Sequence, residues 1–272
     1  MQTLSQIRTL LDSHGLSPRH SLGQNFLVDH NLLGKLVESA SLSPGDLVLE
    51  VGPGTGTLTE TLLERGCEVI ACELDDGLAS LLRATLAPRY PDAFTLVHDD
   101  CLASKRNLRE SLVKALDGRR FKLVANLPYQ AATPLILTLL LAHQNCISLH
   151  VTIQQEVADR ILASPGNKVY GELSVIAQAL GECQRIATLP PGCFWPQPKV
   201  TSAMVSIHRL ASPLIGDTDR LVSMTQHLFA TRRKQLGKIL GRDHPLLEGI
   251  DASQRPESLT VEQICRLAVL DA

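Results

Sequence analysis

The segment EVGPGTG (50–56) constrains the fold of this chain more than any other feature. It follows an apolar run and precedes a stretch with helical spacing, so its glycines allow a tight strand-to-helix turn and close approach of a ligand to the backbone. Position 57 is threonine, so the third glycine of the dinucleotide fingerprint is missing, and no G-K-[ST] of a P-loop follows. The pattern predicts a nucleotide-like ligand other than NAD or FAD.

From residue 46 onward, short apolar runs alternate with helical segments. The predicted strands are 46–51, 68–73, 94–99, 121–126 and 148–153, with helices at 57–65, 75–87, 104–117 and 132–143 between them and a further strand at 200–210. Near-continuous Val/Ile/Leu runs are typical of parallel strands that are covered on both faces. This order predicts an α/β fold with a doubly wound parallel sheet.

The composition changes at the linker that begins at Ala211 (ASPLIGDTD), after which the pattern is helical only. We therefore expect a catalytic domain over residues 1–210 and a small helical domain over residues 211–272. Residues 1–45 are expected to form an N-terminal lid and helix.

Acidic residues follow the ends of two predicted strands. Glu73 closes the second strand, where a carboxylate can accept hydrogen bonds from both hydroxyls of a ribose. Asp99 and Asp100 end the third strand, and one of them could accept a hydrogen bond from an adenine amino group; a solvated pair of acids is the alternative. Asp75 and Asp76 are better suited to the start of the next helix. Together these acids indicate an adenosine ligand.

The sequence NLPY (126–129) ends the fourth predicted strand and is the most specific chemical signal in the chain. An exocyclic amine such as adenine N6 is a poor nucleophile, because its lone pair is delocalised into the ring. The Asn126 side-chain oxygen and the Leu127 carbonyl could accept from its N–H groups and favour a pyramidal amine, while Tyr129 stacks on the base. A proline turn with a buried tyrosine is the structural alternative.

The segment FWPQPKV (194–200) places two adjacent aromatic residues in a rigid proline loop, in a chain with only 5 Phe, 3 Tyr and 1 Trp. Phe194 and Trp195 therefore indicate a second stacking wall for a base, or a loop packed into the core.

A nucleic-acid partner would require a local basic patch, because the formal net charge of −2 excludes a chain that is basic throughout. The sequence predicts such a patch on a helix near the C-terminus, and a merely solvated helix face is the alternative. Its residues are Arg232, Arg233, Lys234, Lys238 and Arg242.

Several function classes are disfavoured by what the sequence lacks. The 7 cysteines form no C-x-x-C pair and the 9 histidines show no metal-ligand spacing, so no metal site is expected. No G-x-S-x-G motif supports a serine hydrolase. No apolar run reaches the roughly 20 residues of a membrane span, and the N-terminus shows no secretory signal pattern. We expect a cytoplasmic protein without a membrane partner.

Nine segments in order, from about residue 19 to 242, resemble the KsgA (RsmA) family of small-subunit rRNA adenine dimethyltransferases. These are Rossmann-like methyltransferases that use S-adenosylmethionine. The resemblance rests on LGQNFL (22–27), EVGPGTGTLT (50–59), Glu73, Asp100, NLPY (126–129), QQEVADR (154–160), YGELSV (170–175), F-x-P-x-P-K-V (194–200) and LFATRRKQLGKIL (228–240).

The resemblance implies a cofactor site built from several parts of the chain. Asn25 and the Leu27 backbone would contact S-adenosylmethionine from the lid, and Gly52 and Gly54 would lie beside its methionine part. Glu73 would hold the ribose. In the same way, Asp100 would bind the adenine amino group, and Asn126 would lie where the cofactor meets the target base.

The resemblance also implies the reaction. Tyr129 and Phe194 would sandwich a flipped adenine, and positioning of the base would replace a general base. The expected product is N6,N6-dimethyladenosine at two adjacent adenines near the 3′ end of 16S rRNA in the 30S subunit or its precursor, formed by a monomer with a role in small-subunit biogenesis. The C-terminal helical domain would contact the RNA. Gln130 departs from the usual asparagine and puts the fine positioning of the base in doubt.

Three other functions remain open at this stage. An Erm-type enzyme that methylates an adenine of 23S rRNA shares the Q-N-F, N-[IL]-P-Y and F-x-P-x-P-K-V elements, although GPGTGTLT, YGELSV and RRKQLGKIL are closer to KsgA. A non-catalytic ribosome-assembly factor would not need an intact Glu73, Asp100, Asn126 and Tyr129. A DNA adenine methyltransferase would need a larger recognition region than the ~60 residues after position 211.

Overall fold

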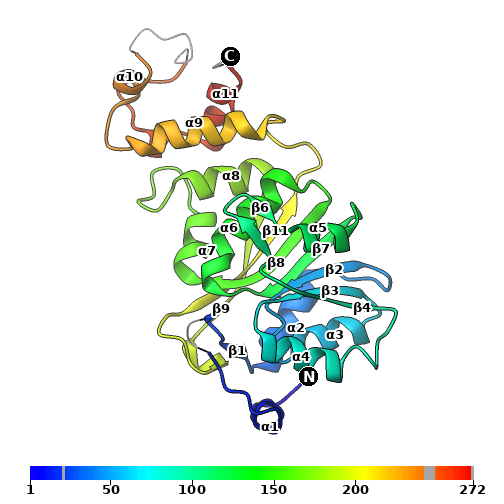
Figure 1. The fold of residues 1–272 in the computed structure, drawn as a ribbon. Coiled ribbons are helices and arrows are strands. Elements are labelled where there is room, and N and C mark those ends of the chain that lie inside the picture. Colours follow the sequence, from blue (N-terminus) through cyan, green and yellow to red (C-terminus); the bar gives the residue numbers. More distant parts are fainter. Residues whose placement is uncertain (20–21, 242–248, 271–272) are drawn as a thin grey trace. The chain divides into compact units, whose positions relative to one another are not determined.

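The computed structural model of the protein describes residues 1–19, 22–241 and 249–270 (Figure 1). The chain forms two compact units: unit 1 is Met1–Gln155 with Gln184–Ile207, and unit 2 is Glu156–Cys183 with His208–Ala272. This division differs from the predicted domains 1–210 and 211–272, because residues 156–183 group with the C-terminal helices. The chain crosses between the units three times, once just after the strand that ends at residue 154 and twice within strands, at 183/184 and 207/208.

A mostly parallel sheet forms the centre of the fold and confirms the predicted α/β class. Within the described residues it has seven strands in the order β4-β3-β2-β7-β8-β11-β9. Their bounds are β2 (Leu47–Val51), β3 (Glu68–Glu73), β4 (Phe94–His98), β7 (Phe121–Asn126), β8 (Cys146–Gln154), β9 (Gly181–Leu189) and β11 (Ser202–Arg209). The pairs β2–β3, β3–β4, β2–β7 and β7–β8 are parallel. The strand order changes direction between β2 and β7, and ligands of such sheets bind at the carboxyl ends beside this point.

Strand β9 is not predicted from the sequence, because its residues lack a continuous apolar run. The segment GECQRIATL is buried at its two ends and exposed or partly exposed between them.

Four helices of unit 1 follow the parallel strands: α3 (Thr57–Glu64), α4 (Asp76–Thr85), α5 (Glu110–Leu116) and α6 (Tyr129–Ala142). The predicted helix at 104–117 is wrong in its first part. Residues 102–108 form an antiparallel hairpin of β5 (Leu102–Ser104) and β6 (Asn107–Leu108). Short polar side chains at this position compete with a helix by bonding locally, and the Ser104 hydroxyl accepts from the Arg106 N–H and the Asn107 amide.

The N-terminal part of unit 1 comprises α1 (Leu4–Ser13), the short strand β1 (Phe26–Leu27) and α2 (His30–Ser39). Helix α1 buries Ile7 and Leu11 in a cluster with Phe26 and two leucines of α4. Strand β1 pairs antiparallel with β10 (Phe194–Trp195), which follows the 3₁₀ turn Pro191–Cys193. Strand β1 is therefore held by α1 through the Phe26 side chain and by β10 through strand pairing.

The described part of unit 2 is mainly helical and also includes the first residues of β9 and the last residues of β11. It contains α7 (Gln155–Ile161, from the last residue of unit 1), α8 (Glu172–Leu180), α9 (Thr218–Ala230), α10 (Leu236–Ile239), the 3₁₀ turn Pro256–Ser258 and α11 (Val261–Leu270). Helices α8, α9 and α11 pack against one another. Tyr170, fully buried, meets Phe229 edge-on at 5.9 Å between ring centroids. None of the described helices is long and apolar enough to span a membrane.

Candidate active site

A cavity of about 290 Å³ lies in unit 1 at the carboxyl ends of β2, β3 and β7. Its volume is at the lower end of the ~300–1,000 Å³ typical of ligand pockets. The predicted residues that line it are Asn25, Leu27, Gly52, Gly54, Glu73, Asp100, Asn126, Leu127 and Tyr129. The fold thus brings together residues that are up to about a hundred positions apart, and the cofactor and base residues of the prediction share one cavity.

The glycine turn forms a thin wall of the cavity. Gly52 and Gly54 have φ angles of 76° and 60°, which side chains other than glycine rarely adopt. A Cβ atom on Gly54 would lie 2.9 Å from the Phe26 ring, and one on Gly52 would lie 3.0 Å from the Pro128 ring. Glycine is therefore required both by the backbone conformation and by the close approach of β1 and the NLPY turn.

Glu73 lies at the end of β3 and is 6% exposed. Its Oε2 accepts from the Gly54 N–H at 3.3 Å, and its Oε1 accepts from the Asp75 N–H at 2.9 Å. Burial raises the pKa of this carboxyl, and the two backbone donors act against that shift. The carboxylate is thus fixed in orientation at the rim of the cavity.

Asp100 follows β4, the strand that pairs with β3 at the same edge of the sheet. Its Oδ1 accepts from the Leu102 N–H at 2.9 Å, and its own N–H donates to Oδ1 of Asp99 at 2.9 Å. Ser111 donates to the second oxygen of Asp99, and this hydrogen bond lowers the pKa of Asp99. Asp99 is therefore engaged with the protein, and Asp100 is the acid beside it that Leu102 orients.

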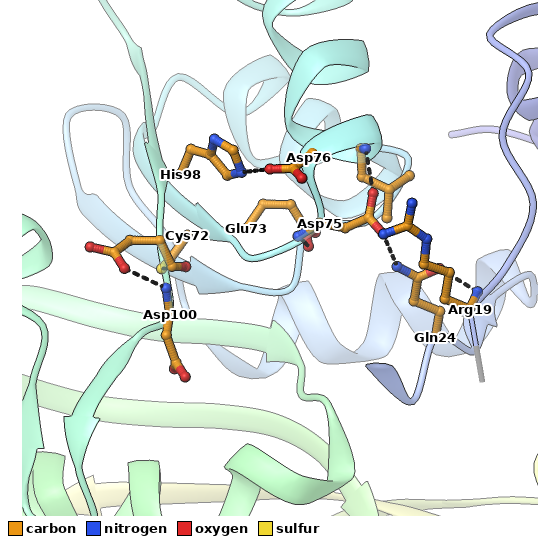
Figure 2. Close-up of polar contacts among 10 residues, drawn as sticks. Arg19, Gln24, Cys72, Glu73, Asp75, Asp76, His98 and Asp100 are labelled. Atoms are coloured by element: carbon orange, nitrogen blue, oxygen red, sulfur yellow. Dashed lines mark hydrogen bonds and ion pairs between the residues drawn. The ribbon is translucent and has the colours of Figure 1, made fainter. Parts of the chain in front are cut away.

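Arg19 and Gln24 of the N-terminal segment contact the start of α4 through the Asp75 carboxylate. Figure 2 shows Arg19 and Gln24 converging on this carboxylate, with Arg19 Nη1 at 3.0 Å and Gln24 Nε2 at 3.3 Å from Oδ2. The other oxygen, Oδ1, accepts from the Leu78 N–H at 2.9 Å, which confirms the predicted role of Asp75 at the start of a helix. Asp75 is 3% exposed, so Arg19 and Gln24 of the N-terminal segment are held by a buried carboxylate.

Asn126 connects the lid to the end of β7. Its Nδ2 donates to the Asn25 carbonyl at 2.9 Å, which leaves Oδ1 as the side chain's acceptor. The Leu127 N–H donates to the Thr152 carbonyl at 3.1 Å and fixes the turn. The Tyr129 hydroxyl lies 2.8 Å from the Ser202 hydroxyl, and burial raises the pKa of this phenol, so it stays protonated at neutral pH. The turn thus carries oriented acceptors and an aromatic ring beside one another.

Phe194 is the predicted site residue that the structure does not bring to the cavity. It lies in β10 opposite Leu27, is 2% exposed, and packs in a core cluster with that residue. Phe194 is described but does not line the cavity, so its stacking on a base stays a prediction. Trp195 stacks on Phe26 at 6.2 Å and lies under the Arg8 guanidinium at 5.0 Å.

Among the lining residues that the sequence prediction gives no role, Glu50 and Leu74 are notable for their chemistry. Glu50, at the end region of β2, is 1% exposed, and its Oε2 has no hydrogen-bond partner in the described structure. Burial and the nearby Glu73 raise its pKa to about 8. Leu74 is a large apolar side chain that is 53% exposed beside Glu73. Two sequence signals could have singled them out: Glu50 is an acid inside an otherwise apolar strand, and Leu74 is a leucine between two acids.

We expect the Glu50→Gln variant to lose most of the fall in unfolding free energy that the wild type shows as pH rises through the titration of Glu50. Folded Glu50 keeps its proton up to a pKa of about 8, whereas the ordinary value is 4.5, so the folded chain holds an extra proton between these values. The unfolding free energy of the wild type then falls as pH rises through this window, by up to about 1.4 kcal/mol per pH unit. Glutamine does not titrate. Urea unfolding at several pH values from 5 to 8 measures the difference, and parallel curves for the two proteins would contradict it.

Arg232, Arg233 and Lys234 lie in a turn between α9 and α10, and Lys238 lies in the short helix α10, so their prediction on one continuous helix is wrong. Arg232 is bound within unit 2: its Nε and Nη2 lie 3.0 Å from Oε2 of Glu257, and Nη2 also donates to the Lys168 carbonyl. Arg233, Lys234 and Lys238 are exposed. Arg242 lies outside the described residues. Across the described ranges, no group of three or more His, Cys, Asp or Glu residues could hold a metal ion.

Comparisons with known proteins agree with this geometry. The family model "Ribosomal RNA adenine dimethylase" matches residues 15–270. Proteins named "Ribosomal RNA small subunit methyltransferase A" from Magnetococcus marinus and Phenylobacterium zucineum are each 40% identical over 276 residues. They cover 98% of this chain and 97% and 93% of their own lengths, respectively.

Solved structures show the same fold. A dimethyladenosine transferase from Plasmodium falciparum superposes with a TM-score of 0.74 at 22% identity, over 89% of this chain and 95% of its own. The 23S rRNA methyltransferase ErmE gives a TM-score of 0.70 at 26% identity, over 90% and 98%. The Rossmann-like methyltransferase fold is thereby confirmed.

The family model matches nearly the whole chain. The two relatives are each 40% identical to this chain, and the alignment covers nearly their whole lengths. The chain therefore belongs to the ribosomal RNA adenine dimethylase family, whose members are enzymes that use S-adenosylmethionine as the methyl donor.

Proposed function

We propose that this chain transfers methyl groups from S-adenosylmethionine to N6 of two adjacent adenines near the 3′ end of 16S rRNA, in the 30S subunit or its precursor. The product is dimethyladenosine, and the protein acts as a monomer in the cytoplasm during small-subunit biogenesis. One observation carries the proposal: Glu73, at the end of β3, and the Asn126–Tyr129 turn line the same cavity.

The residues present fit the cofactor. Glu73 would accept hydrogen bonds from the ribose hydroxyls, Asp100 from the adenine amino group, and the backbone at Gly52 and Gly54 would lie beside the methionine part. Oε2 of Glu50, which has no hydrogen-bond partner in the described structure, is a candidate acceptor for the ammonium group of the methionine part. When bound, the cofactor supplies an electrophilic methyl group on a sulfonium.

The base is held by the turn after β7. Asn126 Oδ1 and the Leu127 carbonyl accept hydrogen bonds from the exocyclic amine and favour the pyramidal geometry that exposes its lone pair, while the Tyr129 ring stacks on the base. The methyl group replaces a proton of the amine, and this proton leaves to water. Positioning lowers the barrier, because the amine is held in line with the methyl group.

The exposed cations of unit 2 support contact with RNA outside the cavity. Arg233, Lys234 and Lys238 are proposed to bind phosphates, as exposed lysines and arginines commonly do. Arg232 is assigned a different role, because Glu257 and the Lys168 carbonyl hold it in the structure of unit 2 itself. Arg232 would maintain the conformation of the turn that carries Arg233 and Lys234.

The alternative of an Erm-type 23S rRNA methyltransferase has support from the likeness to ErmE at 26% identity. The small-subunit enzyme is favoured because relatives with 38–40% identity over more than nine-tenths of this chain carry the small-subunit name.

A methyl-transfer assay with labelled S-adenosylmethionine tests the proposal. Unmethylated 30S particles, 50S particles and duplex DNA are compared, and labelled nucleosides are identified by mass. We expect dimethyladenosine on the 30S particles alone. Label on 50S particles only would establish the Erm-type alternative, and binding to 30S particles without label would indicate an assembly factor.

A further inference from the structure

The hairpin β5–β6 places two cations at a tight turn beside the active-site cavity. Ser104 pairs with Asn107 across the hairpin, so Lys105 and Arg106 form its tip. Both side chains are exposed, and neither has an acidic partner in the described part of the chain. Because the sequence pattern predicts a helix here, no role for these residues follows from sequence reasoning.

The hairpin is held in a fixed position at its base. Leu108 is 5% exposed, and the Leu102 side of the base lines the cavity. The Arg109 N–H donates to the Cys101 carbonyl at 3.0 Å, and Thr138 of α6 donates to the Lys105 carbonyl at 3.5 Å. The tip therefore keeps one orientation relative to the cavity without a ligand to order it.

The charge around the base leaves the tip positive. Arg109 Nε lies 3.2 Å from Asp99 Oδ1, so this neighbouring carboxylate is already paired. Glu110 is paired with Lys114 at 2.8 Å. The charges of Lys105 and Arg106 are thus not neutralised by Asp99 or Glu110.

The distance suits a nucleic-acid backbone whose base is in the cavity. Lys105 is three positions beyond Leu102 (105 − 102), and a strand rises about 3.3 Å per residue, so the tip lies within ~10 Å of a residue that lines the cavity. Proteins that bind a single strand combine a stacking site for the base with nearby cations along the backbone. Lysine and arginine at the end of a rigid turn bind phosphate oxygens by charge-assisted hydrogen bonds.

We propose that Lys105 and Arg106 bind phosphates of the RNA strand next to the adenine in the active site. This inference rests on the proposed function, and it assigns to unit 1 an RNA-binding surface separate from the basic turn of unit 2. It would hold the target strand while the base occupies the cavity.

The test compares the double variant Lys105→Ala/Arg106→Ala with the control Arg65→Ala/Arg120→Ala. Arg65 and Arg120 are also exposed residues of unit 1, but they precede β3 and β7 and so lie at the amino ends of the strands, away from the cavity. Both variants lose the same charge. The probe is the unmethylated 30S particle, and its affinity is measured from 50 to 200 mM salt.

We expect the hairpin variant to bind the 30S particle on the order of tenfold more weakly at low salt, with a log–log salt slope smaller by ~1–1.5, since each phosphate contact on a single strand contributes ~0.7. Its affinity for S-adenosylmethionine should equal that of the wild type, which excludes damage to the cavity. An equal slope in the hairpin variant and the control would overturn the inference and leave the proposed function intact. A wild-type chain that neither binds nor methylates the unmethylated 30S particles would overturn both.

Discussion

Asn126→Ala is expected to lower the rate of methyl transfer by about 10²–10³-fold, comparable to the loss of one preorganised hydrogen-bonding group in other active sites. The variant removes the Oδ1 acceptor that orients the amine. It also removes the bond from Nδ2 to the Asn25 carbonyl, which connects the turn to the lid. The rate is measured in a single turnover with saturating cofactor and 30S particles, so that weaker binding does not imitate slower chemistry.

Asn145→Ala is a matched control for this variant. Asn145 also donates from Nδ2 to a backbone carbonyl, that of Arg119 at 2.9 Å, but it lies at the opposite end of β7 and β8. Its loss should leave the rate within a factor of two, on the order of an ordinary surface substitution. If Asn126→Ala transferred methyl groups as fast as Asn145→Ala, the amine-orienting role would be wrong.

The site residues whose positions can be predicted from the sequence are those whose role depends on the residues next to them in the chain. Glu73 ends a buried strand, and the glycine turn stands between a strand and a helix, so their place at the carboxyl edge follows from topology alone. Asp75 is similar, because a helix cap is decided within a few residues.

The predictions that the structure corrects, or does not place at the cavity, depend on contacts that the local pattern does not show. The sequence pattern predicts a helix from residue 104, yet residues 102–108 form a hairpin in which Leu102 pairs with Leu108 and Leu108 is buried. Arg232 reads as a surface cation until the fold brings Glu257 to it. Phe194 pairs with Leu27, 167 positions away (194 − 27), and nothing in the local sequence indicates that this pairing covers its ring. Local patterns cannot supply such contacts.

Glu73→Ala is expected to weaken S-adenosylmethionine binding by about 10²-fold or more. Hydrogen bonds to a charged group contribute roughly 1.5–3 kcal/mol each, and the carboxylate would accept from the ribose while bound to the Gly54 and Asp75 N–H groups. The variant removes both the ribose acceptor and the anchor of the glycine turn. Titration calorimetry gives the dissociation constant directly. The rise in Tm on adding cofactor gives it independently, because a ligand at 100 times its Kd adds about 2.7 kcal/mol of stability.

Asp76→Ala is the control, since Asp76 is three residues along the chain, carries the same charge and is 89% exposed in the side chain. Its cofactor affinity should match the wild type, although its contact with His98 is lost. The pH dependence separates a direct role of Glu73 from a structural one. Burial raises the pKa of Glu73, and a protonated carboxyl offers one acceptor fewer, so wild-type affinity should fall as pH decreases through that raised pKa. The alanine variant should lack this titration. If it bound cofactor as weakly as expected but kept the wild-type pH profile, Glu73 would act by supporting the Gly54 turn and another group would hold the ribose.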